Sequence, residues 1–392
     1  MFSHFVKRSL HDLVRSPRLA EVVGPERAIN DDARLEAATH WLMRSIDVCE
    51  GRASSKGYRF LRGWMPPYPE TSGYIIPTLL VLGRETGQTG EYAKRARAIG
   101  EWLLSLQQPS GGFLGGELGA HAGEDVFDTG MILLGLNALI HEFRDDAILA
   151  AACRAGDFLI ASMDADGCFV RNLHHGLLHA YNVRAAWSLV ALGKLTGNEH
   201  YAGAGVRNAL WTRAQQNAAG FFDKNGFKKD GNANTHGTAY VMRGLLQIYE
   251  LTGDRENLDS VLKAAVALQA AHDRRGWIAA ELGPDWDYLS PHICLTGYAQ
   301  LAIIFYRLDQ LTGELSFGRT ADQLLRDVGQ TQDLHDPSKP YFGAIAGSFP
   351  IYGRYAPLQY PNWATKFFVD AHIAKRHVAR GQQRHPLQLY GG

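Results

Sequence analysis

Cysteine is scarce in this 392-residue sequence, and no motif pairs the few that occur. They stand far apart, at Cys49, Cys153, Cys168 and Cys294. We therefore expect free buried thiols in a reducing compartment, a cytoplasmic location and no disulfide framework. His174, His175 and His179 are close in sequence, but no cysteine or carboxylate spacing completes a metal site around them. No glycine-rich phosphate loop follows a strand, so we expect neither a metal nor a cofactor.

The sequence also lacks a net charge and long apolar runs. Its 40 basic residues balance its 40 acidic ones, and no basic run is interleaved with aromatics. Nucleic acid is therefore not an expected partner. No stretch approaches the roughly 18 apolar residues of a membrane span, and residues 1–28 contain no apolar signal-peptide core. We expect no transmembrane segment.

A repeated helical unit is what the sequence does contain. Helices of nearly continuous apolar character are predicted to begin near Glu70, Asp128, Tyr181, His236, Thr296 and Pro361. Thr-Gly pairs follow four of them, at Thr86-Gly87, Thr196-Gly197, Thr252-Gly253 and Thr312-Gly313. The helices after these pairs are one-sided, with apolar residues at helical spacing and charges between them. Repeats that each supply a helical hairpin imply a toroid or a solenoid.

Six apolar inner helices with six amphipathic outer partners make an all-α (α/α)6 barrel. The last inner helix has no full partner after it, but a helix from Arg34 to Val48 supplies one and closes the ring. We expect one barrel over residues 31–378, preceded by an extension over 1–30 and followed by a tail over 379–392.

The long connections of this barrel all run from an outer helix to the next inner helix. They cover about 107–127, 164–180, 217–235, 271–295 and 332–361. Connections of one class must lie at one end of the barrel, here the end where the inner helices begin. Long loops in a compact domain are usually functional, and helix N-termini attract anions. We expect the functional site at this end.

Polar residues crowd the predicted starts of the inner helices. Typical helix caps are Thr71, Ser72, Thr129 and Thr296. A turn further in, where capping explains nothing, stand Arg184, Tyr240, Arg243, Gln300 and Lys366. Charges inside apolar helices are costly unless they are paired or hydrated. A solvated polar cavity on the barrel axis explains them, and internal salt bridges, such as Arg184 with Asp128, are the alternative.

Two kinds of sugar chemistry fit these residues. Glycosidic cleavage needs two carboxyl groups that flank the sugar, and Glu70 and Asp128, which start successive inner helices, are the first choice. Proton abstraction from a uronate needs a base, an acid and a cation, and Tyr181, His236 and Tyr240 can supply the base and the acid. Predicted substrate-binding residues are Tyr68, Arg184, Arg243, His292, Trp286, Tyr352, Tyr355, Trp363 and Lys366.

Several motifs, in order, resemble a known family over residues 35 to 375. They are Tyr68-Pro69-Glu70-Thr71-Ser72-Gly73-Tyr74, Phe127-Asp128-Thr129-Gly130, Tyr181-Asn182-Val183-Arg184, Cys294-Leu295-Thr296-Gly297 and Tyr360-Pro361-Asn362-Trp363. The family is the bacterial exopolysaccharide-biosynthesis proteins of the VpsJ type. The resemblance implies a six-hairpin toroid and a role in surface polysaccharide, with association with polysaccharide-assembly machinery, but it implies no particular reaction. More distantly, the barrel is similar to those of glycoside hydrolases, polysaccharide lyases and glucuronyl C5-epimerases.

A second resemblance concerns the turn after the first outer helix. Gln107, Gly111 and Phe113 resemble the Gln-x3-Gly-x-Trp repeat of squalene and hopene cyclases, which are also α-toroids. A terpene cavity is apolar, however, and Arg184, Arg243, His236 and Lys366 argue against one.

We therefore expect a carbohydrate-active enzyme that cleaves glycosidic bonds, as a hydrolase or a lyase, in an acidic oligo- or polysaccharide. The alternatives are a uronate C5-epimerase, a non-catalytic glycan-binding assembly protein and a terpene-cyclase-like toroid.

Overall fold

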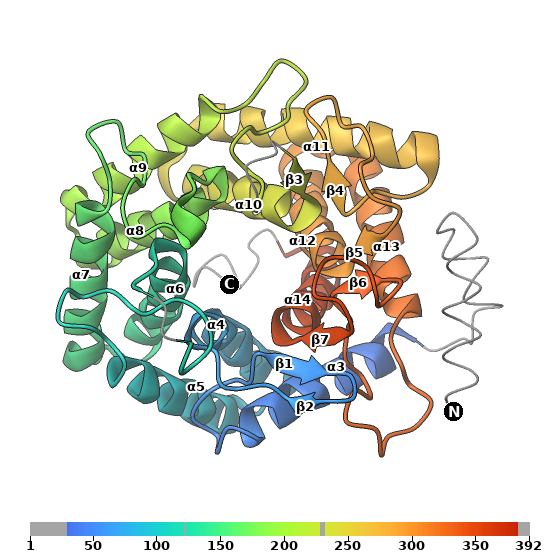
Figure 1. The fold of residues 1–392 in the computed structure, drawn as a ribbon, viewed down its shortest axis with the longest axis horizontal. Coiled ribbons are helices and arrows are strands. Elements are labelled where there is room, and N and C mark those ends of the chain that lie inside the picture. The colour runs from blue at the N-terminus through green and yellow to red at the C-terminus, as the bar shows by residue number, and fades with distance from the viewer. Residues whose placement is uncertain (1–29, 121–122, 228–231, 383–392) are drawn as a thin grey trace.

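Twelve α-helices form one closed ring in the computed structural model (Figure 1), which describes residues 30–120, 123–227 and 232–382. The inner helices are α4 (Pro69–Thr86), α6 (Val126–Phe143), α8 (Val183–Thr196), α10 (Thr235–Thr252), α12 (Leu295–Thr312) and α14 (Asn362–Ala379). The outer helices are α3 (Asp31–Asp47), α5 (Thr89–Leu104), α7 (Asp146–Ala161), α9 (Glu199–Arg213), α11 (Arg255–Arg275) and α13 (Leu315–Gln330). The predicted (α/α)6 barrel is confirmed. The extension over 1–30 and most of the tail over 379–392 lie outside the described residues.

The Thr-Gly pairs end inner helices for a local reason. Gly87, Gly197, Gly253 and Gly313 stand just after α4, α8, α10 and α12 with φ between 68° and 77°. Glycine adopts this left-handed conformation without the steric cost of a Cβ atom. The preceding threonine hydroxyl donates a hydrogen bond to the carbonyl four residues back, as from Thr86 to Leu82 at 2.8 Å. Each pair therefore stops its helix and turns the chain outward.

The first and last helices close the ring. Helix α3 packs against α14, and α14 also packs against α4, so the inner helices form an unbroken circle. Lys375 of α14 binds Asp31 at 2.9 Å, and Arg376 binds Asp32 at 2.5 Å. The closing helix predicted over Arg34 to Val48 is thus confirmed, three residues longer at its start and one residue shorter at its end.

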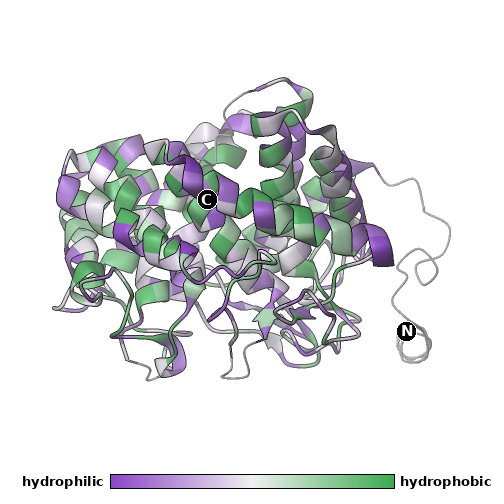
Figure 2. Cartoon of the chain, turned by 90° about the horizontal axis from the view of Figure 1, so that it is seen from above, coloured by the Kyte–Doolittle hydropathy of each residue, from purple (hydrophilic) through white to green (hydrophobic). Residues whose placement is uncertain are grey.

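The long loops gather at one end of the barrel (Figure 2), where the inner helices begin. Short strands tie neighbouring loops together: β1 (Gly57–Arg59) lies between β2 (Gly63–Trp64) and β7 (Gln359–Pro361), β3 (Ala233–Asn234) pairs with β4 (Glu281–Leu282), and β5 (Ile293–Cys294) pairs with β6 (Ser348–Phe349). Two short 3-10 turns, η1 (His174–Gly176) and η2 (Ala180–Asn182), precede α8.

A glutamine fastens the turns after α5 and α9 to the next outer helix. Gln107 donates to the carbonyls of Gly111 and Ala151 at 2.9 and 2.8 Å. Gln216 makes the equivalent pair of bonds, to Gly220 and Ser260, both at 2.9 Å. The cyclase-like motif at Gln107 is therefore a structural latch between repeats. The sequence comparison missed the equivalent role of Gln216.

One inner helix, α6, has the length and apolar composition of a membrane span. The relevant window of α6 is, however, 83% buried inside the barrel, as expected for the core helix of an α-toroid.

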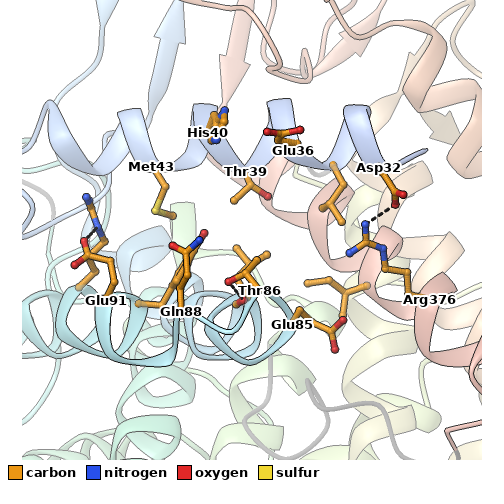
Figure 3. A pocket seen from close by; sticks show the side chains of 15 residues that line it. Asp32, Glu36, Thr39, His40, Met43, Glu85, Thr86, Gln88, Glu91 and Arg376 are labelled. Carbon is orange, nitrogen blue, oxygen red and sulfur yellow. Dashed lines mark hydrogen bonds and ion pairs between the residues drawn. The ribbon is translucent and has the colours of Figure 1, made fainter. Parts of the chain in front are cut away.

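A groove of about 600 Å³ lies between α3, α4 and α5, at the end of the barrel away from the long loops (Figure 3). Several of its charged side chains are paired: Asp32 with Arg376, Glu91 with Arg95 at 2.9 Å, and Glu85 with His377 at 2.8 Å. The first and third of these pairs join α14 to α3 and to α4, and so brace the ring closure.

Neighbouring inner helices approach closely because glycines stand where they cross. A Cβ atom at Gly73 of α4 would lie 2.5 Å from the Ile132 Cα atom of α6. A Cβ atom at Gly130 or at Gly244 would likewise meet the backbone of α8, and one at Gly297 would meet the backbone of α10. Each crossing therefore leaves no room for a side chain.

We expect Gly73→Ala to lower the free energy of unfolding by about 1–3 kcal/mol, because helix α6 has to shift to admit the methyl group. The matched control is Gly203→Ala in α9, where the nearest atom is the flexible Arg207 Nη1 at 3.8 Å. That variant should gain about 0.5–1 kcal/mol from better helix propensity. Chemical denaturation measures both, and equal effects would contradict the crossing constraint.

Candidate functional site

Three carboxylates from two adjacent inner helices meet at the loop end of the barrel. Glu70 stands in the first turn of α4, Asp128 stands in the first turn of α6, and Asp125 caps α6 by accepting bonds from the Phe127 and Asp128 N–H groups at 2.7 and 3.2 Å. Asp128 accepts a bond of 2.8 Å from Gly116 N–H in the preceding loop. Each carboxylate keeps only 4–5% of its surface exposed.

Burial shifts the protonation of two of these acids. It raises the pKa of Glu70 to about 7, although the Tyr68 hydroxyl, which donates to its carboxylate, and the Arg184 charge oppose the shift. Burial, together with the charges of Asp125 and Glu70, holds the pKa of Asp128 well above its usual range. Near neutral pH Glu70 is therefore partly ionised, and it lies beside an acid whose ionised form is disfavoured.

The serine and threonine hydroxyls at these helix starts do not cap their own helices. Ser72 Oγ accepts from Ser54 N–H at 2.9 Å, and Thr129 Oγ1 accepts from Phe113 N–H at 3.0 Å. The cap prediction is wrong for both residues, because each hydroxyl holds the preceding loop against its helix. Asp125 and Asn234 are the caps of α6 and α10.

Tyr68, Trp363 and Tyr355 form an aromatic edge beside Glu70. The Tyr68 and Trp363 rings meet edge to face at 6.2 Å, and the Trp363 indole donates to the Tyr355 hydroxyl at 2.8 Å. The Lys56 ammonium lies 5.3 Å from the Tyr68 ring centre and 3.6 Å from Glu117. Lys56 thus brings a cation to the carboxylate cluster.

His236 and Tyr240 occupy the first turns of α10, with ring centres 4.1 Å apart. Gln300 of α12 lies 2.6 Å from His236 Nδ1, and the Tyr355 ring lies 5.3 Å from the imidazole. Burial and the Arg184 charge lower the pKa of His236 to about 3, so the imidazole is neutral at physiological pH. A neutral imidazole can accept a proton.

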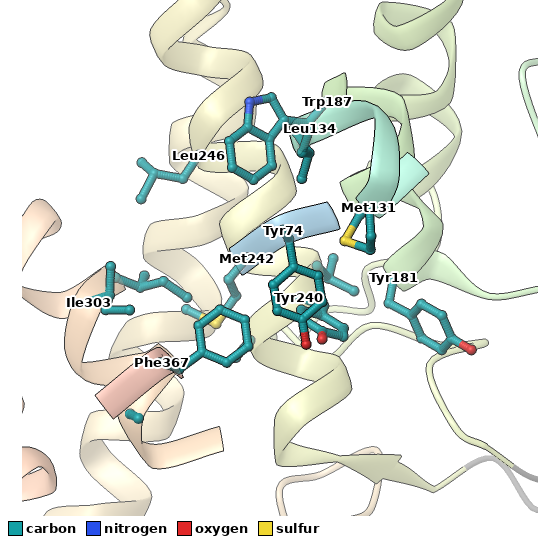
Figure 4. Packing of buried hydrophobic residues seen from close by; sticks show 14 of the residues in the cluster. Tyr74, Met131, Leu134, Tyr181, Trp187, Tyr240, Met242, Leu246, Ile303 and Phe367 are labelled. Atoms are coloured by element: carbon teal, nitrogen blue, oxygen red, sulfur yellow. The ribbon is translucent and has the colours of Figure 1, made fainter. Parts of the chain in front are cut away.

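Arg184 lies deeper, entirely buried and surrounded by aromatic rings. Its guanidinium carbon is 4.8 Å from the Tyr240 ring centre, 5.5 Å from Phe367 and 5.9 Å from Tyr74. Figure 4 shows Tyr74, Tyr240 and Phe367 close together, with Tyr181 beside them. Arg184 Nε contacts Met131 Sδ at 3.1 Å, but Nη1 and Nη2 have no hydrogen-bond partner among the described residues. The predicted alternative, a salt bridge from Arg184 to Asp128, does not form in that part of the chain.

Tyr181 completes the cluster from the third hairpin. Its ring stacks on His179 at 4.4 Å and meets Phe127 edge to face at 5.2 Å and Tyr240 at 6.4 Å. Residues predicted to converge from α4, α6, α8 and α10 therefore do lie together. What each does in a reaction stays a prediction.

Lys366 and Arg243 lie in the barrel interior. Lys366 Nζ is 2.7 Å from Asp370 Oδ2, which is on the same helix, and Thr78 of α4 donates to the other Asp370 oxygen at 2.9 Å. Arg243 lies 5.9 Å from the Trp187 ring, and burial lowers the pKa of Arg243 to about 10. Lys366 thus forms an internal salt bridge with Asp370. Internal salt bridges were the alternative to a solvated cavity in the sequence analysis.

Three predicted binding residues are placed by contacts within the loops. The Trp286 indole donates to Ala219 O at 2.8 Å and packs on Phe221, and only 6% of the residue is exposed. His292 accepts from Arg354 N–H at 3.2 Å. Tyr352 is half-buried in the same loop as Tyr355. The contacts of Trp286 and His292 hold loops together, and neither contacts the carboxylates.

Sequence reasoning gave no role to two groups at the site. His174 Nδ1 lies 3.5 Å from Asp125 Oδ2, and this carboxylate raises the pKa of His174. Lys56 lies on the loop before α4, where no pattern indicated its approach to α6. The sequence did offer a signal for Asp125, the partner of His174. Asp125 stands three residues before Asp128, where aspartate is typical of a helix cap. No group of three metal-ligating side chains occurs among the described residues.

No family model matches the sequence, and no curated protein sequence matches it. Solved structures share its fold. An unsaturated glucuronyl hydrolase specific for heparin matches 90% of this chain and 99% of its own, with a TM-score of 0.71 and 14% identity. The unsaturated glucuronyl hydrolase of Bacillus sp. GL1 matches 90% and 98%, with a TM-score of 0.67 and 15% identity. A polysaccharide lyase matches 89% and 98%, with a TM-score of 0.62 and 12% identity. At these identities the likeness is one of fold.

We expect Lys366→Met to lower the free energy of unfolding by about 3–5 kcal/mol, because it leaves Asp370 buried without its cation. The double variant Lys366→Met/Asp370→Leu should recover most of that loss, since it removes both charges. Thermal or chemical unfolding measures the difference. A stable single variant that only binds substrate less well would show that Lys366 acts at the site.

Proposed function

We propose that this chain cleaves glycosidic bonds in an acidic oligo- or polysaccharide. The observation that carries the proposal is the pair of buried carboxyl groups at Glu70 and Asp128, one with its pKa well above the usual range and the other near 7. Cleavage of a glycosidic bond needs such a pair, in which one group donates a proton to the leaving oxygen while the other acts as base or nucleophile.

Asp128 suits the role of acid. Burial beside two other acids disfavours the ionised form of its carboxyl group and raises its pKa, and Gly116 N–H fixes one of its oxygens. Glu70, which Tyr68 orients by a hydrogen bond, suits the role of base or nucleophile once it is ionised. Positive charge from Lys56 favours the ionised form of both acids.

Arg184 suits recognition of the acidic sugar. Its two terminal nitrogens are buried without a partner in the described chain, and an uncompensated guanidinium is costly unless a ligand pairs with it. A planar carboxylate can accept two parallel bonds from such a group. The glucuronyl hydrolases and the lyase that share the fold act, by their descriptions, on uronate-containing glycans or polysaccharides, in keeping with this proposal.

A second candidate is proton abstraction at C5 of a uronate, leading to elimination or to C5 epimerisation. The observation that favours it is the neutral His236 beside Tyr240, with Arg184 4.8 Å from the Tyr240 ring. In that reaction the imidazole or the phenol removes the C5 proton, while Arg184 neutralises the carboxylate and stabilises the charge that develops on it.

For the biological setting we propose surface-polysaccharide metabolism in the cytoplasm, in association with polysaccharide-assembly machinery. The role and the association rest on the resemblance of the sequence motifs to the exopolysaccharide-biosynthesis proteins of the VpsJ type, and the location rests on the scattered, unpaired cysteines.

Asp128→Asn should lower turnover by about 10²–10⁴-fold while the melting temperature stays within a few degrees, because an amide cannot donate the acid proton. Hydrolysis is detected as new reducing ends, elimination as absorbance of a 4,5-unsaturated product, and epimerisation as deuterium incorporation at C5. His236→Ala should abolish the last two signals if proton abstraction operates. Unfolding of both variants would assign the two residues to structure, and silence of the wild type in all three assays would favour a glycan-binding protein.

The pH dependence follows from the two raised pKa values. Glu70 ionises near pH 7, so the rate should rise through that range, and it should fall as Asp128 loses its proton, at a pH above the usual range of an aspartic acid. Lys56→Met removes a charge that lowers both pKa values, so both limbs should move to higher pH. The control is Lys339→Met, since both lysine side chains are 27% exposed and paired with a carboxylate. A profile that does not change in Lys56→Met would contradict these assignments.

A further inference from the structure

A cavity of about 580 Å³ opens at the loop end of the barrel, between the C-termini of the outer helices α3 and α5. Its walls include two half-buried tryptophans, Trp64 of β2 and Trp102 of α5. Val48 and Leu118, which also line it, are 47% and 48% exposed. Large apolar side chains thus remain in solvent around this cavity, and such surfaces mark binding sites.

A second cavity of about 260 Å³ adjoins the first, since Leu118 lines both. It lies between the turn after α5, residues 105–108, and the loop over 113–120. Leu118 N–H donates to Pro67 O at 2.9 Å, so Leu118 is fastened to the segment that leads into α4.

The second cavity has wall residues that contact or directly adjoin the carboxylate cluster. Gly116, which lines it, donates to Asp128, and Pro69, which also lines it, directly precedes Glu70. Leu118 stands two positions after Gly116, which is at most about 7 Å of extended chain. A continuous lining therefore runs from the proposed reaction centre to the two tryptophans.

The internal repeat supplies a comparison for Trp102. Trp102 stands five residues before the latch Gln107, and Trp211 stands five residues before the equivalent latch Gln216. The Lys224 ammonium covers the Trp211 ring at 5.4 Å, whereas Trp102 faces the cavity. The same position in the repeat is thus covered in one hairpin and left open in the hairpin beside the site.

We propose that these two cavities bind the sugar units of an acidic glycan beyond the unit held at Glu70 and Asp128, with the distal units stacked on Trp102 and Trp64. Sugar rings present apolar C–H faces that suit tryptophan surfaces. Arg52 lines the first cavity, and Lys56 lies 3.6 Å from Glu117, which lines the second, so both bring positive charge near acidic units. This inference rests on the proposed function. It makes the preferred substrate an oligosaccharide of several units.

The test compares Trp102→Ala with Trp211→Ala, using a disaccharide and a hexasaccharide from lyase-digested heparin. In Trp102→Ala, kcat/KM for the hexasaccharide should fall about tenfold, mainly through KM, as expected for the loss of one aromatic contact. The disaccharide, too short to reach Trp102, should change less than twofold. Trp102→Phe should recover most of the hexasaccharide activity, and Trp211→Ala should behave as wild type.

Equal losses on both probes, or the same loss in Trp211→Ala, would overturn the extended subsites and leave the cleavage proposal intact. Calorimetric binding of the hexasaccharide to wild type and Trp102→Ala separates the two proposals if neither probe is cleaved. Binding that Trp102→Ala weakens would then support the subsites while the cleavage proposal fails. Wild-type protein that neither binds nor cleaves the hexasaccharide would overturn the subsites.

Discussion

The close approach of the inner helices is the constraint on which the rest of the barrel depends. At successive crossings a glycine faces the neighbouring helix, so that a Cβ atom would stand 2.5 Å from the Ile132 Cα at Gly73, 2.6 Å from the Ala185 Cα at Gly130 and 2.9 Å from the Val183 carbonyl carbon at Gly244. Such contacts bring backbones together with no side chain between them. Arg184 directly precedes Ala185, which faces Gly130, and Tyr240 stands one turn before Gly244, so both side chains are buried among the inner helices.

This tight ring explains the electrostatics of the site. Acids placed at the starts of two adjoining helices are forced near one another and away from water, and both effects disfavour ionisation. Glu70 and Asp128 therefore have raised pKa values, while the same burial lowers that of His236. A single geometric arrangement thus disfavours the charged forms of two acids and of an imidazole within one cluster.

The fold could be predicted from the sequence because its signals are local. A Thr-Gly pair stops a helix by its own backbone geometry, and apolar periodicity distinguishes inner from outer helices. The positions of Glu70 and Asp128 followed from the helix starts. The hydroxyls of Ser72 and Thr129, the ion pair of Lys366 and the approach of Lys56 and His174 to the acids could not be predicted. Each depends on how a loop crosses a helix that is distant in sequence, which no local pattern encodes.

Ring closure by α3 and α14 has a consequence for how the chain folds. Asp31 and Asp32 find their partners Lys375 and Arg376 only when nearly the whole described chain is present. Contacts of such long sequence separation form late, and nascent chains begin to fold from the N-terminus. Until the last hairpin emerges from the ribosome, the arc of inner helices stays open, with Arg184 and its aromatic neighbours in contact with water. The polar axis that serves the site in the closed ring thus keeps the incomplete arc more soluble than an apolar axis would.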